Sequence, residues 1–217
     1  MAKRVALPNG AVVQIASGYG TAIPFATISN AAPPVIDADA HGLAADDYVL
    51  VDSGWCELDG RGYKVGVTDV DTLTLLGADT TDTTFFPPGS GAGDLLPVSG
   101  WVDLPCITDS ALNGGEPQSV TVACLQEKNE SEIPNGYSAQ SMQFTIAYDP
   151  KSASLPILKD LSKREARSMI RVIVPGMVEL IYPGYISISP APTLTRGEVM
   201  TRVLTVRISE ITEYPEV

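Results

Sequence analysis

Short alternating apolar runs, separated by turn residues, are the feature that most limits what this 217-residue chain can fold into. Between residues 26 and 86, runs such as "DYVLVDS" and "YKVGVTDV" alternate apolar and polar side chains, and clusters of Gly, Pro, Asn or Asp separate them. A period of two predicts β-strands, and turn signals at this spacing are typical of small barrels and sandwiches. We therefore expect a mainly β protein.

One segment predicts a helix. The stretch "DPKSASLPILKDLSKREA", residues 149–166, places leucines at helical spacing, and Pro156 fits only in a first turn, so the helix should begin near Ser154. Asp149 or Ser152 is the expected cap. Alternating strands are expected before the helix at 119–127 and 139–149, and further strands after it. This order predicts an antiparallel sheet with one helix packed on it.

The stretch "TRGEVMTRVLTVRIS", residues 195–209, predicts one long strand with an unusual pattern. Leu204 and Val206 share a face with Arg202, while the other face carries residues such as Thr205 and Arg207. A half-buried strand is expected to be apolar on one side and polar on the other. The pattern therefore predicts a strand whose two faces both make functional contacts.

Charge is distributed unevenly along the chain. The net charge is −12 and the pI is near 4.4, which argues against tight binding to nucleic acid. Residues 26–97 contain eleven Asp and one Glu against two basic residues. Residues 86–100, "FPPGSGAGDLLPVSG", are rich in Pro and Gly and predict a connector with little to pack. We expect a host domain of residues 1–25 and 98–217, with residues 26–97 inserted as an acidic module.

The chain shows no motif for catalysis or for a cofactor. It has no glycine-rich phosphate-binding motif and no serine-hydrolase elbow, and His41 is its only histidine. Cys56, Cys106 and Cys124 are widely spaced, which predicts buried free thiols and no zinc site. The stretch "DADAHGLAADDY" begins like a calcium loop, but a tyrosine, Tyr48, stands where that loop needs its final glutamate. We predict no enzyme activity, no cofactor and no metal site.

The acidic module resembles a small β-barrel known as the first catalytic-cysteine half-domain of ubiquitin-activating enzymes, which recurs in phage structural proteins. The matching stretches are "HGL" (41–43), "DDYVLV" (46–51), "ELDGRGYKV" (57–65) and "DTLTL" (71–75). Asp59 and Leu73 depart from the usual Asn and Phe of that pattern. The resemblance implies a decoration or spacer, and it gives Cys56 no catalytic role.

The remainder resembles the tail tube (major tail) proteins of long-tailed, lambda-like phages over about half of the chain. The stretches that carry the resemblance are "SMQFTIAYDP" (141–150), "RSMIRVIVPGMVELIYPGYISIS" (167–189) and "LTRGEVMTRVLTVRISE" (194–210), with Leu204 in place of the usual Thr. The implied fold is an antiparallel sheet or sandwich of the tail tube type, all-β with one short helix, into which the small β-barrel is inserted.

This resemblance implies a structural virion protein of the phage tail, assembled in the host cytoplasm. Homohexameric rings would stack into a tube that holds the tape measure protein and passes viral DNA during ejection without binding it specifically. The expected partners are further copies of the chain, the tape measure protein, and the tail terminator and distal tail proteins, with no membrane. An acidic or neutral lumen would let DNA slide, and Glu179 is one candidate for that wall.

The resemblance also implies two sets of contact residues. The strand that lines the tube wall is expected to include Val199, Thr201, Arg202, Val203, Thr205 and Arg207. A long polar loop, residues 126–138, would be an arm that reaches the next ring; the alternative is an ordinary mobile surface hairpin. Its expected contact residues are Glu127, Lys128, Glu130, Glu132, Ile133 and Tyr137.

Two other functions remain open from the sequence. The first is a tail terminator or hub of the same fold, which forms a single ring that does not polymerise. The second is a host-surface or carbohydrate-binding module whose acidic insertion is the binding part. Deletion of residues 26–97 is expected to separate the second alternative from a tube subunit, because a tube subunit should still assemble.

Overall fold

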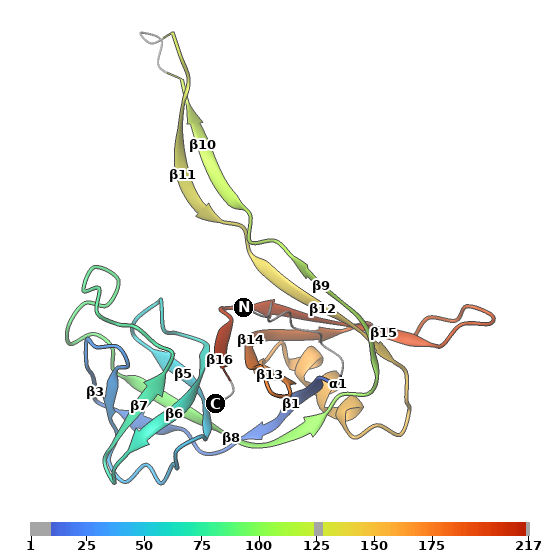
Figure 1. Ribbon diagram of the computed structural model, residues 1–217, viewed down its shortest axis with the longest axis horizontal. Helices are drawn as coiled ribbons and strands as arrows, with labels where there is room; N and C mark the ends of the chain where they lie inside the picture. Colours follow the sequence, from blue (N-terminus) through green and yellow to red (C-terminus); the bar gives the residue numbers. More distant parts are fainter. Residues whose placement is uncertain (1–9, 124–127, 216–217) are drawn as a thin grey trace, which may run out of the picture.

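The structure, a computed structural model, describes residues 10–123 and 128–215 of the chain. It is mainly β with one short helix, and its strand pairings are antiparallel, which confirms the predicted class. Figure 1 shows a curved sheet carrying the helix, a second lobe of strands beside it, and two long projections.

The elements follow one another along the chain with the helix between the twelfth and thirteenth strands. They are β1 (Val12–Tyr19), β2 (Ile23–Phe25), β3 (Thr27–Ile28), β4 (Val35–Asp37), β5 (Tyr48–Ser53), β6 (Arg61–Thr68), β7 (Thr72–Leu76), β8 (Gly93–Asp103), β9 (Ile107–Asn113), β10 (Pro117–Val122), β11 (Ser131–Tyr137), β12 (Gln140–Ala147), α1 (Ser154–Arg164), β13 (Arg167–Val174), β14 (Val178–Ile188), β15 (Thr201–Ile208) and β16 (Thr212–Pro215).

The main sheet has the strand order β8-β1-β13-β14-β15-β12-β9, and every neighbouring pair is antiparallel. β16 pairs with the first half of β14, and β15 pairs with the second half of the same strand. Helix α1 covers one face of this sheet (Figure 1), and Leu158 of the helix is fully buried there. Phe144 and Tyr182 meet edge to face beneath it, with ring centroids 6.3 Å apart.

Helix α1 begins at Ser154, as the proline position predicted, but it has no side-chain cap. Its N-cap is Ala153, so the prediction that Asp149 or Ser152 caps the helix was wrong. The Asp149 carboxylate instead accepts a hydrogen bond from the backbone N–H of Lys151, which stabilises the turn before the helix. The helix ends at Arg164, and its C-cap Glu165 adopts a left-handed conformation (φ 51°).

The second lobe contains the strands from β2 to the first half of β8. Successive pairings run β3-β4-β7-β6-β5-β8, and β8 also pairs with β2. Because β2 and β3 are separated only by Ala26, these pairings form a closed circuit. The circuit surrounds its own apolar core, in which Trp55 is buried and donates its indole N–H to the carbonyl of Pro87 (2.8 Å).

His41 has a structural part in this lobe. Its ring is buried, and its Nδ1 accepts a hydrogen bond from the backbone N–H of Leu43 (3.0 Å). The Nε2 atom must then carry the proton, and it donates to the carbonyl of Asp69 (2.8 Å). The only histidine of the chain therefore joins two turns.

The prediction of a loose connector at residues 86–100 was wrong from Gly93 onward. β8 begins at Gly93 and continues for eleven residues, and Leu95 within it is fully buried. Its first half pairs with β2 and β5 in the lobe, whereas its second half pairs with β1 in the main sheet. A single strand thus belongs to both parts of the molecule.

A further apolar cluster fills the junction between the lobe and the main sheet. It contains Tyr48 and Leu50 from β5 together with Met169, Ile181 and Tyr214 from the sheet side. Each part contributes fully or nearly fully buried side chains, so separating the lobe from the sheet would expose apolar surface to water on both sides.

Polar groups in the junction are also paired. Tyr48 donates its hydroxyl to the carboxylate of Glu179 (2.6 Å), and burial together with this carboxylate raises the pKa of Tyr48 well above its usual value. The guanidinium of Arg171 lies 4.4 Å from the Trp101 ring centroid and donates to the side-chain oxygen of Gln14. Glu179 therefore lies in the junction, and its expected place on a lumenal wall was wrong.

Two of the three cysteines depart from the predicted burial. Cys56 and Cys106 are both exposed free thiols. Cys124 lies outside the described residues.

The packing of α1 yields a direct test. Leu158→Ala should lower the free energy of unfolding by about 2–5 kcal/mol, because it removes a fully buried side chain from a close-packed core. Chemical denaturation followed by circular dichroism measures this change. The matched control is Lys159→Ala, an exposed neighbour on the same helix, which should shift stability by less than about 0.5 kcal/mol. Equal effects of both substitutions would contradict the assigned helix face.

Candidate assembly surfaces

Strand β15 begins at Thr201, so the predicted strand over residues 195–209 was wrong in its first six residues. Residues 190–200 instead form a projecting loop between β14 and β15, called the finger here (Figure 1). Val199, predicted to lie in the wall strand, is in the finger and is 70% exposed. Leu194, on the other limb of the finger, is 82% exposed.

The two faces of β15 differ clearly once the strand is in place. Leu204 and Val206 are fully buried beneath α1, and Arg202 on the same face is only 5% exposed. Thr201, Val203, Thr205 and Arg207 lie on the opposite face, which the helix does not cover. Both faces were expected to make contacts, and the Arg202 face makes them within the subunit, where it packs beneath α1 as part of the core.

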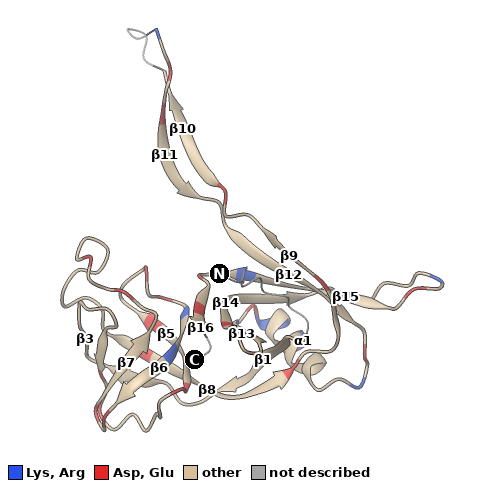
Figure 2. Cartoon of the chain, viewed as in Figure 1, with Lys and Arg blue, Asp and Glu red and all other residues tan. Residues whose placement is uncertain are grey.

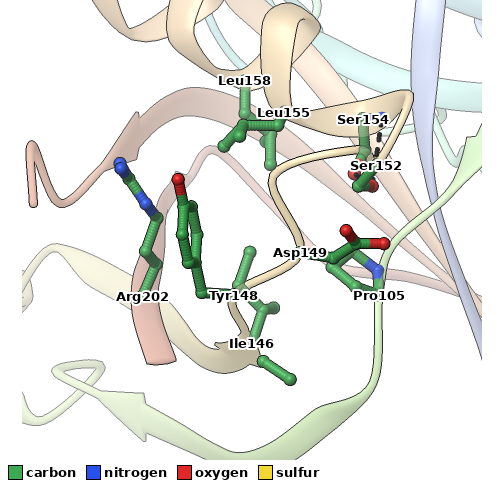
Figure 3. Close-up of a pocket in the computed structure, with 10 residues that line it drawn as sticks. Pro105, Ile146, Tyr148, Asp149, Ser152, Ser154, Leu155, Leu158 and Arg202 are labelled. Carbon is green, nitrogen blue, oxygen red and sulfur yellow. Dashed lines mark hydrogen bonds between the residues drawn. The ribbon is translucent and has the colours of Figure 1, made fainter. Parts of the chain in front are cut away.

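Arg202 fastens the base of the finger. Its guanidinium lies 5.0 Å from the Tyr148 ring centroid (Figure 3), and its Nη1 atom donates to the carbonyls of Ser189 (2.7 Å) and Pro190 (3.3 Å). Its buried Nε has no hydrogen-bond partner among the described residues. The adjoining space, lined by residues such as Asp149 and Leu155, holds only about 10 Å³, which is room for one water molecule.

The face opposite α1 is uncovered over β15, β12, β9 and the second half of β14, and is called the bare face here. Its cross-strand rows follow the register: Arg207 pairs with Ser141, Thr205 with Gln143, and Val203 with Thr145. The face as a whole is formed by Ser141, Gln143, Thr145, Asp109, Ala111, Asn113, Tyr185, Ser187, Thr201, Val203, Thr205 and Arg207. Asp109 and Arg207 are its only charged residues in the described chain, so its net charge is zero.

The region predicted as a polar loop is instead half of a long hairpin. β10 and β11 pair with each other and not with the main sheet, and together they form an arm, residues 117–137, that projects far from the body (Figure 1). The prediction of a loop was wrong at Ser131–Tyr137, because those residues form strand β11.

The expected contact residues lie along one strand of the arm and beyond its end. Ile133 pairs with Val120 across the arm, and both side chains are exposed. Tyr137, at the base of the arm, is 76% exposed. Lys128, Glu130 and Glu132 are also exposed, and Glu127 lies outside the described residues.

The described residues offer several surfaces for association. They contain no group of three His, Cys, Asp or Glu side chains that could hold a metal ion. In the same residues, no helix is both long and apolar enough to cross a membrane. Large apolar side chains are exposed on the arm and on the finger. Exposed apolar side chains of this kind are typical of surfaces that a partner covers.

Comparison with known families decides what kind of assembly this is. A sequence model of the phage tail tube protein family matches residues 53–215, about three quarters of the chain. The chain belongs to the phage tail tube protein family. Tail tube proteins are structural components of the phage tail that associate into a tube, and the family is not enzymatic. Comparison with curated proteins found no match.

The match covers most of the surfaces described above. It begins at the last residue of β5 and extends to the end of β16, so it includes the arm, the finger and the bare face. Sequence reasoning missed the finger, although Pro190 and Pro192 before residues 195–209 and Gly197 within them were turn signals. It also missed the packing role of Arg202, which no local pattern reports.

The role of Arg202 can be tested by amide hydrogen exchange. Arg202→Ala removes the donor to two carbonyls at the base of the finger, so exchange in residues 190–200 should accelerate at least about tenfold. Arg207→Ala, on the exposed face of the same strand, is the matched control and should leave exchange in the finger unchanged. Equal acceleration in the two variants would show that Arg202 does not hold the finger.

Proposed function

We propose that this tail tube protein closes into homohexameric rings and that these rings stack into a tube. The tube would hold the tape measure protein and pass viral DNA during ejection, with terminator and distal tail proteins at its two ends. The observation that carries the proposal is that the main sheet has two unpaired edges at its opposite ends, described next. Assembly in the host cytoplasm is part of the same proposal.

The two sheet edges are suited to pair with each other between copies. Among the described strands, β9 pairs only with β12, and residues 98–103 of β8 pair only with β1. Neither edge contains a Lys or a Pro, two residue types that commonly protect free edges. Six successive antiparallel pairings separate β8 from β9, so both strands run in the same direction. Adjacent copies in a ring would therefore join by a parallel β9–β8 pairing, which leaves no edge open.

The bare face is suited to line the channel. Its rows are mostly Ser, Thr, Gln and Asn, and its net charge is zero. Basic residues on a wall would bind DNA by releasing counterions from its phosphates. A wall with one Arg and one Asp per subunit has no net attraction for phosphate, which supports rapid passage of DNA.

The arm is the proposed contact between rings. It extends well beyond the body of the subunit (Figure 1) and presents the exposed Val120–Ile133 pair. An isolated two-stranded hairpin is only marginally stable in water. Packing of Ile133 and Tyr137 against the next ring would bury this apolar surface and order the arm.

The acidic lobe is proposed to be an inserted barrel that faces outward. Figure 2 shows acidic residues on its strands and loops, and its closed circuit of pairings supports a domain division near residues 26 and 97. Deletion of residues 26–97 is nevertheless unsuitable as a test. It would cut β8 and expose the buried junction at Met169 and Ile181, so the sheet itself would fail.

Point substitutions on the arm test the stacking of rings. Ile133→Asp should abolish filaments or raise the concentration needed to form them at least about tenfold, because a charge would be buried at the centre of the contact. Negative-stain electron microscopy over a range of protein concentrations measures this. The control is Val67→Asp on the lobe, where the valine is 80% exposed and outside the arm, and filaments should form normally. Loss of filaments in both variants would count against the arm.

The unsubstituted protein serves as the reference in the same experiment. Hollow filaments with six-fold rings support the tube subunit. Discrete rings that never stack would instead favour the terminator or hub.

The lumenal assignment has its own test. Gln143 and Thr205 are neighbours on β12 and β15, and replacing both by Lys should make assembled tubes retain DNA at low salt and release it as salt is raised. Co-sedimentation of tubes with DNA measures retention. The control replaces Val67 and Val70, two exposed valines of the lobe, by Lys. Tubes of this variant should retain less DNA. Equal retention would place the bare face outside the channel.

A further inference from the structure

The finger and the lobe lie at opposite ends of the molecule. In Figure 1, which has the longest axis horizontal, the finger projects from one end and the lobe occupies the other. Copies related by rotation in a ring meet through different surfaces, and where their longest axes follow the circumference, one end of each copy faces the opposite end of its neighbour. A ring of this chain would therefore bring the finger of one copy toward the lobe side of the next.

The finger has the features of a preformed docking element. Backbone hydrogen bonds join Ser189 to Val203 (2.9 Å) and Thr193 to Thr201 (2.9 Å), and Arg202 holds the base as described above. Beyond this ordered base, Leu194 and Val199 expose most of their surface to water. A segment that is already ordered loses little conformational entropy on binding.

A cleft of about 390 Å³ lies between the lobe and the C-terminal segment before β16. Ile211, which is half-buried, provides apolar surface in it beside the buried Leu58 and Phe86, and the exposed Asp79 and Glu213 provide negative charge. Neither carboxylate has an ion-pair partner among the described residues. Hydrogen bonds from the hydroxyl and the backbone N–H of Thr81 also hold the pKa of Asp79 below its usual value, so this side chain stays ionised.

The charges of the finger complement those of the cleft. Arg196 is the only cation of the finger, it is exposed, and it has no carboxylate partner in the described residues. Glu198 is its only anion, and the cleft contains Arg61, which already pairs with Glu57 and Glu210. The finger thus presents apolar side chains beside a cation, and the cleft presents apolar surface beside two free carboxylates.

We propose that the finger of one copy docks into this cleft of the neighbouring copy, with Leu194 on the apolar surface and Arg196 facing Asp79 and Glu213. This inference rests on the proposed ring. It adds a second contact between adjacent subunits, separate from the β9–β8 pairing, and it gives the acidic lobe a part in assembly. The partner is a second copy of this chain.

Disulfide trapping tests the contact directly. In a background with Cys56, Cys106 and Cys124 replaced by Ser, Leu194→Cys is combined with Ile211→Cys on the apolar surface of the cleft, and the assembled protein is mildly oxidised. The expected result is a ladder of covalent oligomers on a non-reducing gel. The control combines Leu194→Cys with Val67→Cys, since Val67 is exposed on the lobe outside the cleft, and it should give no ladder above background.

Charge reversal provides a second measurement that needs no cross-link. Arg196→Glu should raise the concentration required for assembly by roughly tenfold, and adding Glu213→Arg should restore much of the loss. If the protein assembles but the test and control cysteine pairs give equal ladders, the docking is overturned and the tube is not. The same holds if Arg196→Glu leaves the concentration required for assembly unchanged. If neither the unsubstituted protein nor the cysteine-free parent assembles at any concentration, the proposed ring and the docking are overturned together.

Discussion

Strand β8 is the element on which the rest of the structure depends. Its eleven residues hydrogen-bond to β2 and β5 in the lobe and to β1 in the main sheet, so one run of backbone fixes the relative position of both parts. The junction that this position creates is filled by Tyr48, Met169 and Ile181 and closed by the Tyr48–Glu179 hydrogen bond. Because both the backbone ladder and the apolar contact would have to break together, the lobe is held rigidly against the sheet.

This rigidity determines what is left for assembly. One face of the sheet is occupied by α1, and part of the opposite face is occupied by the lobe. What remains uncovered is the bare face, two sheet edges and the exposed apolar residues of the arm and the finger. The open edges and the exposed apolar side chains are unfavourable for an isolated subunit, since both invite association. In a stacked ring all of them would be covered or would face the channel.

Much of the fold could be predicted from local pattern. The alternating runs gave the β class, and the position of Pro156 gave the start of α1, because both are set by backbone geometry within a few residues. β8 was missed because its Gly and Pro residues indicate a connector, and the pairings that order it come from strands far away in the sequence.

The assembly surfaces were harder to predict. The exposure of Leu194 and the burial of Arg202 depend on where β15 begins. Alternating side chains do not locate that boundary, because the projecting loop before the strand continues the same alternation. The arm was recognised as a projecting segment, but its second limb was expected to be a loop and not a strand, since "SEIPNGY" is polar and contains a proline. The family, in contrast, was recognisable from its strand motifs, and the family match over residues 53–215 supports that recognition.

The central claim is that β9 of one copy pairs with β8 of the next to close a ring. Cryo-electron microscopy of filaments assembled from the purified protein, at a resolution that traces individual strands, tests it most directly. The expected result is a continuous sheet around the channel, with a parallel β9–β8 pairing at every subunit boundary and the Thr205–Gln143 row facing inward. A tube in which β9 remains unpaired, or in which α1 lines the channel, would contradict it.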